Sequence, residues 1–303
     1  MHPAASKNPA VPHSDAEEAH ASPGNTPCTL TVSIVTFAPD LPLLSECIAS
    51  LNTAACVAIQ QGILANASLD LIDNGPGNEW RERLLALSYD LRSRPDFLLP
   101  IQVRSGHGNR GFGAGHNMAI RDSAADFHLI LNPDVILDAH AISVGLVFLK
   151  EHPQAGVVSP KAESAPGVRQ YLCRIYPNLL DLFLRGFAPP FARRPFARRL
   201  AAAERRDACG ESPALDMEII SGCFMLYRRE LLQQLHGFCE DFFLYFEDFD
   251  LSLRTSRVAR LAYVPGMRIL HAGGNAGRKG LRHVRMFVAS AWTFFNRHGW
   301  RLW

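Results

Sequence analysis

The sequence predicts an α/β protein in which helices flank a mostly parallel, Rossmann-like central sheet. Short apolar runs alternate with longer helical stretches from residue 30 to residue 131. The runs are apolar on both faces and rich in Val, Ile and Leu, which is typical of central parallel strands. Asp, Asn and Gly follow them, as expected where strands end in turns. This repetition indicates a doubly wound layer.

The first half contains the clearest elements. The β-branched residues Val32, Ile34 and Val35 predict an opening strand, and turn residues from Asp73 to Gly77 end the second one. The predicted strands are Leu30–Phe37, Leu69–Asp73, Ile101–Arg104 and Phe127–Leu131. Helices are predicted between them over about Leu41–Gln61, near Asn78–Tyr89 and from about Gly113.

The termini and the second half are less regular. Residues 1–28 repeat Pro and Ala without a period, so we expect a disordered leader. Strands are predicted at Gly156–Ser159 and Gly222–Tyr227, separated by an irregular, arginine-rich stretch of about 60 residues. Helices are predicted over Asp248–Ser256 and Leu281–Arg297.

Composition narrows the class of protein. Apolar residues make up 48% and charged residues 20%, which is typical of a globular protein with a sizeable core. The net charge of +2 excludes a strongly basic nucleic-acid coat and an acidic disordered chain. No apolar run of about 18 residues predicts a transmembrane helix, and the start of the chain lacks a signal pattern. Seven scattered Cys without a C-x-x-C pair favour reduced thiols and a cytoplasmic location.

Polar residues follow four successive predicted strands. They are Thr36-Phe37, Asp73-Asn74, a glycine-rich turn after Arg104, and Asn132-Pro133-Asp134. Ligands bind beyond the carboxyl ends of strands in open α/β sheets, so these groups are expected to surround one ligand. Turn formation and helix capping are the alternative interpretation of each group taken alone.

The glycine-rich turn has two interpretations. Residues 106–111 match G-x-G-x-x-G, and with Asp134 as a ribose-binding acid they favour an NAD-dependent oxidoreductase. The match lies in the third strand–helix unit, however, and glycines continue through Gly113 and Gly115 to Asn117. The other interpretation is therefore that the backbone approaches a ligand over the longer segment 106–117.

Acidic residues and one histidine are candidates for catalysis. Asp134 is placed to hold Mg²⁺ or Mn²⁺ against the diphosphate of a nucleotide-sugar, or to cap a helix. Glu247 and Asp248 lie within the aromatic run 242–249, where a buried carboxylate suits general-base catalysis. They also suit the acidic first turn of a helix. His271 is either a core histidine or a second metal ligand beside Asp134.

The ordered motifs resemble family 2 glycosyltransferases of the GT-A fold, and most nearly the rhamnosyltransferase-like branch that builds bacterial surface polysaccharides. The resemblance covers roughly residues 30–275. It rests on the segments 32–37, 73–75, 109–117, 131–134, 221–226, 237–238 and 247–251, and on His271. The first strand departs from the common V-T-Y-N ending, since it reads Phe37-Ala38-Pro39-Asp40, and Asp134 is the only acid at the D-x-D position.

The resemblance implies specific roles. Asp248 would be the base that deprotonates the acceptor hydroxyl, with Glu247 orienting the acceptor or supporting Asp248. Asp134 and His271 would hold a divalent cation, Mg²⁺ or Mn²⁺. The donor nucleotide would lie against Thr36, Phe37, Asp73, Asn74, Asn109, Gly111, Phe112, Asn117, Asn132 and Asp134.

The function implied is inverting transfer of a sugar from a nucleotide-diphosphate donor to a glycan or lipid-linked acceptor, with L-rhamnose from dTDP-rhamnose as the first expectation. A glycosyltransferase domain would span 29–275, with its nucleotide-binding half at about 29–140 and its acceptor half at about 141–275. An NAD-dependent oxidoreductase and a non-catalytic sugar-nucleotide or glycan-binding protein are the alternatives. Replacing Asp248 by Asn distinguishes these functions, since a transferase should lose sugar transfer and keep donor binding.

A basic, aromatic helical extension is predicted over 276–303. Seven Lys/Arg and no Asp/Glu occur from Arg268 to Trp303. Together with the arginines of 185–206, this segment suits peripheral contact with an anionic membrane, on the inner face of the cytoplasmic membrane. An ordinary packed terminal helix is the alternative. No nucleic-acid recognition motif is present.

Overall fold

The computed structural model describes residues 26–186, 188–272 and 280–303. Most of the predicted leader lies outside these residues. The first strand, β1 (Cys28–Thr36), begins at the last residue of that leader, two positions before the predicted start of the strand.

The first half of the chain forms the parallel part of the sheet. The strands β1, β2 (Leu64–Asp73), β3 (Ile101–Arg104) and β4 (Phe127–Leu131) pair in the order β3-β2-β1-β4, all parallel. The helices α1 (Leu41–Gln60), α2 (Asn78–Arg92) and α3 (Phe112–Asp122) connect them. The predicted strands and helices of this half are therefore confirmed, and the carboxyl ends of all four strands share one edge of the sheet.

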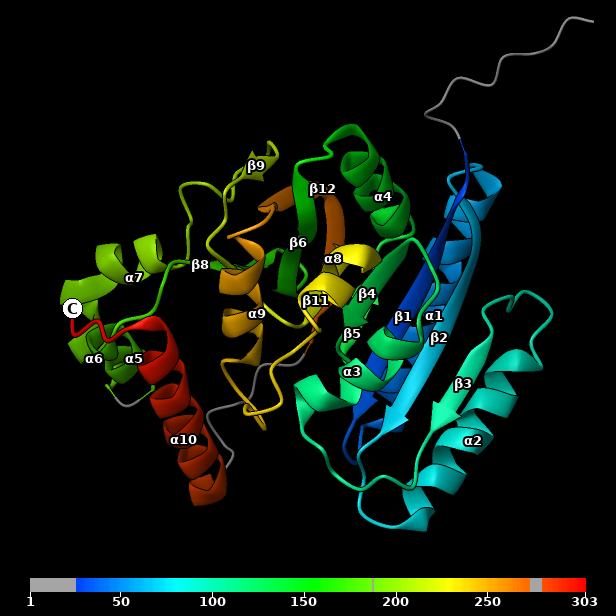
Figure 1. Cartoon of the computed structure of the whole chain (residues 1–303), viewed down its shortest axis with the longest axis horizontal. Coiled ribbons are helices and arrows are strands. Elements are labelled where there is room, and N and C mark those ends of the chain that lie inside the picture. The colour runs from blue at the N-terminus through cyan, green and yellow to red at the C-terminus, as the bar shows by residue number, and fades with distance from the viewer. Residues whose placement is uncertain (1–25, 187, 273–279) are drawn as a thin grey trace, which may run out of the picture.

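The sheet continues with strands from the second half (Figure 1). Beyond β4 come β11 (Phe224–Arg228), β6 (Ala155–Ala165), β12 (Arg260–His271) and β5 (Val135–Leu137), of which β11 and β5 run antiparallel to their neighbours. Short strands β7 (Val168–Gln170) and β9 (Ala214–Leu215) pair with β6 and β12. The sequence does not predict β12, because Pro265-Gly266 interrupts its pattern at the point where its register with β6 shifts.

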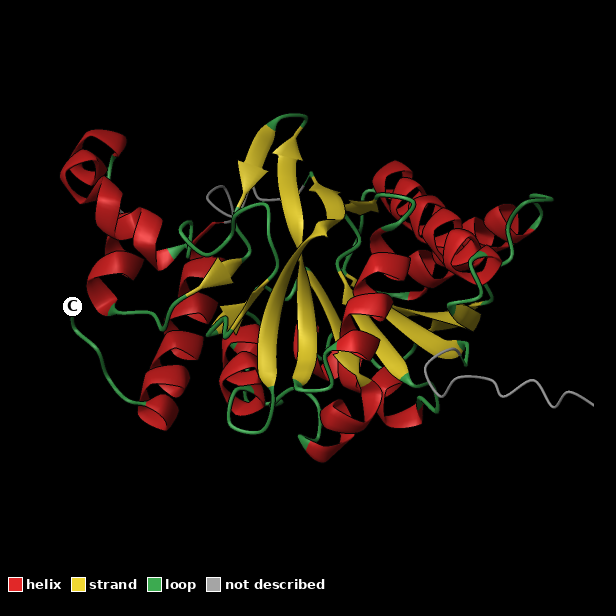
Figure 2. Ribbon diagram, turned by 90° about the horizontal axis from the view of Figure 1, so that it is seen from above, coloured by secondary structure: helices red, strands yellow, loops and turns green. Residues whose placement is uncertain are grey.

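Helices cover both faces of the sheet (Figure 2). Side chains alternate across each strand, so Leu129 of β4 packs in a core with α1, α2 and α4 (Ala141–Glu151). Its neighbour Ile130 packs in a second core with α3, α8 (Arg229–Gln234) and α9 (Glu247–Thr255). The prediction of a helix-flanked sheet is confirmed.

The prediction of an irregular stretch between Ser159 and Gly222 is wrong, because this segment contains short helices and strands. They are β8 (Cys173–Arg174), α5 (Leu179–Gly186), α6 (Pro190–Arg193), a 3-10 turn at Arg194–Phe196, α7 (Ala197–Ala203) and β10 (Ile219–Ile220). Helices of two turns or fewer show too little periodicity to be read from sequence. In Figures 1 and 2, α5, α6 and α7 gather with α10 (Gly280–His298) beyond one end of the sheet.

Among the described helices, α1 is long and apolar enough to cross a membrane, although the sequence contains no unbroken apolar run of that length. Eight residues of α1 are buried, and the seven apolar ones belong to the core shared with β2 and α4. This packing accounts for the apolar composition of α1.

Candidate active site

A cavity of about 390 Å³ opens beside the carboxyl ends of β1 and β2, a volume typical of small-ligand sites. Six residues that the sequence predicts as nucleotide contacts line it, namely Thr36, Phe37, Asn74, Asn109, Gly111 and Phe112. The arrangement brings together three strand ends that lie far apart in the chain. Gly106 and Gly108 of the G-x-G-x-x-G match do not line this cavity.

The loop before α3 is held by the backbone of Phe243 and by the side chain of Asn74. Gly111 has a φ of 88°, and a Cβ added there would clash with the carbonyl oxygen of Phe243. The Phe112 N–H donates to that same oxygen at 3.0 Å. The Asn74 amide donates to the Gly111 carbonyl at 2.8 Å, and His107 Nε2 contacts Asn74 Oδ1 at 3.0 Å. Only glycine fits at 111, and Asn74 serves as a brace for the loop.

Helix α10 closes the cavity from the other side. Arg282, His283 and Met286 line it together with Phe243 and Leu244. Two hydrogen bonds fix the helix there, from Ser290 Oγ to the Leu244 carbonyl at 2.8 Å and between Tyr245 Oη and His283 Nδ1 at 3.0 Å. The sequence does not predict these contacts, because a basic terminal helix carries no signal of which pocket it covers.

Asp73 and Asn117 do not line the cavity. Asp73 is 4% exposed, and its Oδ1 accepts from the Gly75 N–H at 2.8 Å. The Asn117 amide donates to the Phe238 carbonyl at 2.9 Å and accepts from the Phe238 N–H at 2.8 Å. Both side chains hold turns near the cavity, and their predicted contact with a nucleotide stays a prediction.

The turn before β11 joins the remaining motifs. The Asn132 N–H donates to the Cys223 carbonyl at 2.9 Å, and the Gly222 N–H donates to Asp248 Oδ2 at 2.8 Å. A Cβ at Gly222 would lie 3.3 Å from the Phe112 ring, which lines the cavity. The segment 132–134, Asp248 and the cavity wall therefore meet at one turn. Burial raises the pKa of Cys223 to about 12, so this thiol stays neutral and is no nucleophile.

Glu247 and Asp248 begin α9 after a strained turn. Tyr245 and Phe246 have φ values of 72° and 65°, a conformation that costs about 1–3 kcal/mol per residue and is concentrated at functional sites. Packing of Phe242, Phe246 and Phe294 in one aromatic cluster holds this turn. The turn directs Asp248 toward Gly222 and places it in the first turn of α9, where the helix dipole favours a carboxylate.

The two acids differ in their surroundings. Burial raises the pKa of Asp248, but its carboxylate accepts two backbone N–H bonds, from Gly222 at 2.8 Å and Phe249 at 3.0 Å, which favour the charged form. Burial, and then the charge of Asp248, raise the pKa of Glu247 well above its usual value, and Glu247 Oε2 is buried without a partner. Burial and the neighbouring charge therefore favour the protonated form of Glu247, whereas the two backbone hydrogen bonds of Asp248 favour its ionised form.

Asp134 and His271 meet because β5 pairs with the end of β12, where His271 lies opposite Val135. His271 Nε2 lies 3.4 Å from Asp134 Oδ1. His271 Nδ1 donates to Gln170 Oε1 at 3.1 Å, which leaves the Nε2 lone pair directed at the carboxylate. The sequence carries no signal for Gln170, since β7 is a three-residue strand.

This pair fits a divalent cation. Asp134 Oδ1 is buried without a hydrogen-bond partner and faces His271 Nε2, the ring nitrogen that carries a lone pair in the neutral imidazole. Carboxylate oxygen and neutral imidazole both bind Mg²⁺ or Mn²⁺, and the bond to Gln170 fixes the tautomer that a metal requires. Within the described residues, no group of three or more His, Cys, Asp or Glu side chains is gathered to hold a metal. The other ligands would come from substrate oxygens or water.

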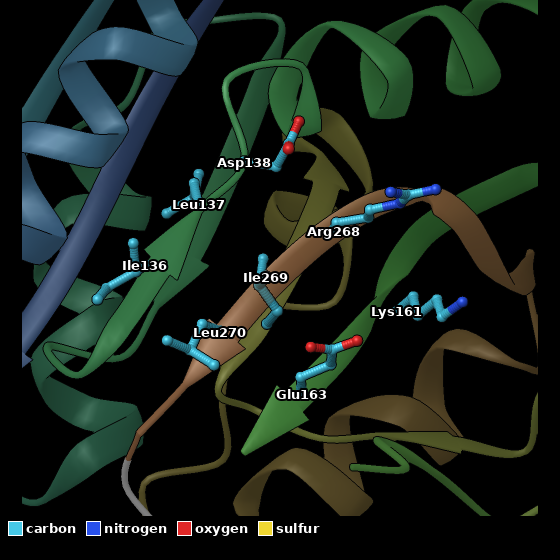
Figure 3. A pocket seen from close by; sticks show the side chains of 8 residues that line it. All are labelled: Ile136, Leu137, Asp138, Lys161, Glu163, Arg268, Ile269 and Leu270. Atoms are coloured by element: carbon cyan, nitrogen blue, oxygen red, sulfur yellow. The ribbon is translucent and has the colours of Figure 1, made fainter. Parts of the chain in front are cut away.

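A second hollow lies along β5, β6 and β12. Figure 3 shows Lys161 and Glu163 extending from β6, Arg268 from β12, and Asp138 just after β5. The hollow shares two strands with Asp134 and His271, but none of the residues predicted for the site lines it. The cavity beside β1 and β2 and the Asp134–Asp248 region therefore remain the candidate site.

Comparisons with known proteins agree with this architecture. No family model matches the chain. The mannosyltransferase PcManGT from Pyrobaculum calidifontis, solved with GDP-Man and Mn²⁺, matches with a TM-score of 0.54 and 14% identity, over 91% of this chain and 77% of that one. GalNAc-T7, solved with UDP, GalNAc and Mn²⁺, matches with a TM-score of 0.55 and 13% identity, over 80% of this chain and 43% of that one. These matches show the GT-A fold.

The chain is a glycosyltransferase of the GT-A fold. Its similarity to curated proteins points to one branch of that class. The N-acetylglucosaminyl-diphospho-decaprenol L-rhamnosyltransferase of Mycobacterium tuberculosis is 29% identical over 283 residues, which cover 89% of this chain and 86% of the relative. Rhamnosyltransferase WbbL of Escherichia coli is 27% identical over 172 residues, 53% of this chain and 60% of the relative. These relatives support a sugar-transfer role in polysaccharide synthesis, which replaces the oxidoreductase interpretation of the glycine-rich turn.

Proposed function

We propose that this protein transfers L-rhamnose, with inversion, from dTDP-rhamnose to a lipid-linked sugar diphosphate acceptor. The observation that carries the proposal is the position of Asp248, a partly buried carboxylate that accepts a hydrogen bond from the turn bordering the cavity. One-step inversion needs a single base, and the raised pKa of Glu247 beside it favours Asp248 for that role. The rhamnosyltransferase relatives support the donor sugar, and the name of the mycobacterial relative supports the acceptor class.

The chemistry follows from these positions. Asp248 accepts the proton of the acceptor hydroxyl, and the oxygen of that hydroxyl forms a bond to the anomeric carbon of the donor. The bond from that carbon to the diphosphate oxygen breaks, and the nucleoside diphosphate leaves with the electron pair. Arg282 lines the cavity and attracts the negatively charged diphosphate. Asp134 and His271 would hold a divalent cation, which supplies charge neutralisation for the leaving group.

Product analysis tests the donor and the acceptor together. The full chain is incubated with Mn²⁺, a prenyl-diphospho-N-acetylglucosamine, and in parallel dTDP-rhamnose, a UDP-sugar or a GDP-sugar. Mass spectrometry is expected to find a deoxyhexose added to the acceptor only with dTDP-rhamnose. Transfer from another donor would overturn the assignment of rhamnose, and transfer from none would contradict the proposed function.

The raised pKa of Glu247 predicts that replacing this residue by Gln has a mild effect. Glu247→Gln reproduces the neutral acid in size and polarity, so we expect kcat to fall by less than about tenfold, a loss of under about 1.4 kcal/mol. A fall in kcat as large as that of Asp248→Asn would show that Glu247 acts as an ionised base.

The activity is also expected to depend on pH. Because Asp248 must be ionised to act, kcat/KM of the wild-type protein and of Glu247→Gln is expected to decrease as pH falls through the raised pKa of Asp248.

We also propose that α10 rests on an anionic lipid surface. Leu281, Val284, Val288 and Trp292 lie three or four residues apart, so they share one face of the helix, and they are 84%, 40%, 57% and 62% exposed. Arg282 and Arg285 are on the same helix, which contains no acid. An apolar stripe beside arginines suits insertion at the boundary of anionic headgroups and acyl chains, where a lipid-linked acceptor would be found.

Flotation with vesicles of phosphatidylglycerol and phosphatidylcholine tests this contact. Two glutamates at Val288 and Trp292 are expected to weaken partitioning by more than about tenfold, since each buried apolar side chain contributes about 1.5–3 kcal/mol. The matched control places glutamates at Leu85 and Tyr89, which are 45% and 78% exposed on α2. Equal flotation of the two double variants would exclude α10 as the membrane contact.

A further inference from the structure

An arginine cluster lies where the helices α5 and α7 approach β8. Arg174 of β8, Arg185 of α5 and Arg206 surround a single carboxylate, Glu204, which follows α7. Arg185 Nη1 and Arg206 Nε each lie 2.7 Å from a Glu204 oxygen, whereas Arg174 Nη1 is 3.9 Å from it. Three guanidinium groups against one carboxylate leave an excess of positive charge, and Arg174 is the least committed of the three.

The cluster is connected to Asp248 through β10. Arg174 pairs in register with Ile219, and the Ser221 N–H donates to the Leu172 carbonyl at 2.9 Å. The next residue, Gly222, bonds the Asp248 carboxylate at 2.8 Å. In Figure 1, β8 lies between α7 and α9. Arg174 is close enough that its positive charge acts to lower the pKa of Asp248, in opposition to burial.

Arg174 is anchored by one hydrogen bond and is partly exposed to solvent. In the described part of the chain its guanidinium donates one hydrogen bond, from Nη1 to the Cys173 carbonyl at 3.3 Å. The side chains of Arg174 and Arg185 are each 30% exposed, and that of Glu204 is 16% exposed. Arg185 is fixed by Glu204 and by the Leu200 carbonyl at 2.8 Å, so it adds charge without being free to move. The side chain of Arg206 is 50% exposed, but its Nε and Nη2 both bind Glu204, so Arg174 is the arginine of the cluster with the most donors left for an anion.

We propose that Arg174, supported by the charge of Arg185, binds the phosphate group of the acceptor and so selects acceptors that carry phosphate on the sugar to be extended. The inference rests on the proposed function and adds the residue that recognises the acceptor. The attacking hydroxyl and the phosphate-bearing carbon belong to one sugar ring, so the phosphate must lie about a ring's width from the base. Arg174 lies on β8, which pairs with β10 just before the turn that binds Asp248, and a planar guanidinium is well suited to phosphate oxygens.

Two acceptors and three variants test the proposal. Kinetics are measured with a prenyl-diphospho sugar and with a neutral alkyl glycoside of the same sugar. Arg174→Gln is expected to raise KM for the diphosphate acceptor by about 10- to 100-fold, the loss of one charged hydrogen-bonding partner, and to leave KM for the neutral acceptor unchanged. Arg174→Lys is expected to recover part of the loss. The control Arg257→Gln removes an exposed arginine that follows α9 and is expected to change neither.

The outcomes separate the two proposals. An equal rise in KM for both acceptors, or a loss confined to kcat, would overturn the inference, since it would mean that Arg174 acts only on Asp248 or on the fold. If the wild-type chain transfers to neither acceptor, the proposed function fails, and calorimetry then decides on the anion site alone. A soluble alkyl diphosphate is titrated in excess Mg²⁺ with the donor site filled by thymidine diphosphate. Binding that is unchanged in Arg174→Gln would exclude the site.

Discussion

Replacing Asp248 by Asn is expected to lower kcat by about 10²- to 10⁴-fold, the contribution of a positioned general base, while leaving donor binding unchanged. The substitution keeps the size of the side chain and an oxygen able to accept from the Gly222 N–H, so the turn at the cavity wall is preserved. What it removes is the negative charge that accepts the proton of the acceptor hydroxyl. Turnover under donor and acceptor saturation gives kcat, and calorimetry with thymidine diphosphate gives donor affinity.

The control for this experiment is Asp96→Asn. Asp96 is an exposed acid before β3, and its replacement also removes one negative charge. We expect it to change neither kcat nor donor affinity. Turnover of Asp248→Asn within a few-fold of wild type would refute the assignment of the base. A parallel loss of donor affinity would mean that the substitution disturbs the cavity.

Removing the metal ligand is expected to have the second largest effect. Asp134→Ala is expected to abolish Mn²⁺ binding and to lower kcat by about 10²- to 10³-fold, because the leaving diphosphate loses several kcal/mol of charge stabilisation. His271→Ala removes the facing nitrogen, 3.4 Å from Asp134 Oδ1, and is expected to act in the same direction. Electron paramagnetic resonance of Mn²⁺ measures the metal affinity directly, without relying on activity.

Gln170, which accepts a hydrogen bond from His271, provides a weaker perturbation of the metal site. Gln170→Leu removes the acceptor of the His271 Nδ1 proton and is expected to weaken Mn²⁺ binding by about 10- to 100-fold, the usual effect of an outer-sphere partner. Glu163→Gln is the matched control, since it removes a carboxylate from the neighbouring hollow (Figure 3). Unaltered Mn²⁺ affinity in Asp134→Ala and His271→Ala would place the cation elsewhere.

Much of the fold could be predicted because its signals are local. The runs at 32–35 and 127–131 are apolar on both faces, and turn residues follow them, so central strands and their order along the chain are readable. The strand ends then mark the cavity, and six of the residues predicted for the nucleotide line it. The strand β12 was not predicted, because a Pro-Gly break divides its pattern and only pairing with β6 and β5 makes it one element.

The candidate site, like the fold, has features that the sequence predicts and features that it does not. Residue type and neighbouring turns are local properties, so the acids, the imidazole and the glycines at the strand ends can be identified from the sequence. Tertiary packing is needed to show that Gln170 orients His271, that α10 closes the cavity and that β8 joins Arg174 to the turn that binds Asp248. These contacts join segments far apart in the chain. Their partners are selected by strand register and helix packing, which depend on the whole core and leave no periodic trace near any one residue.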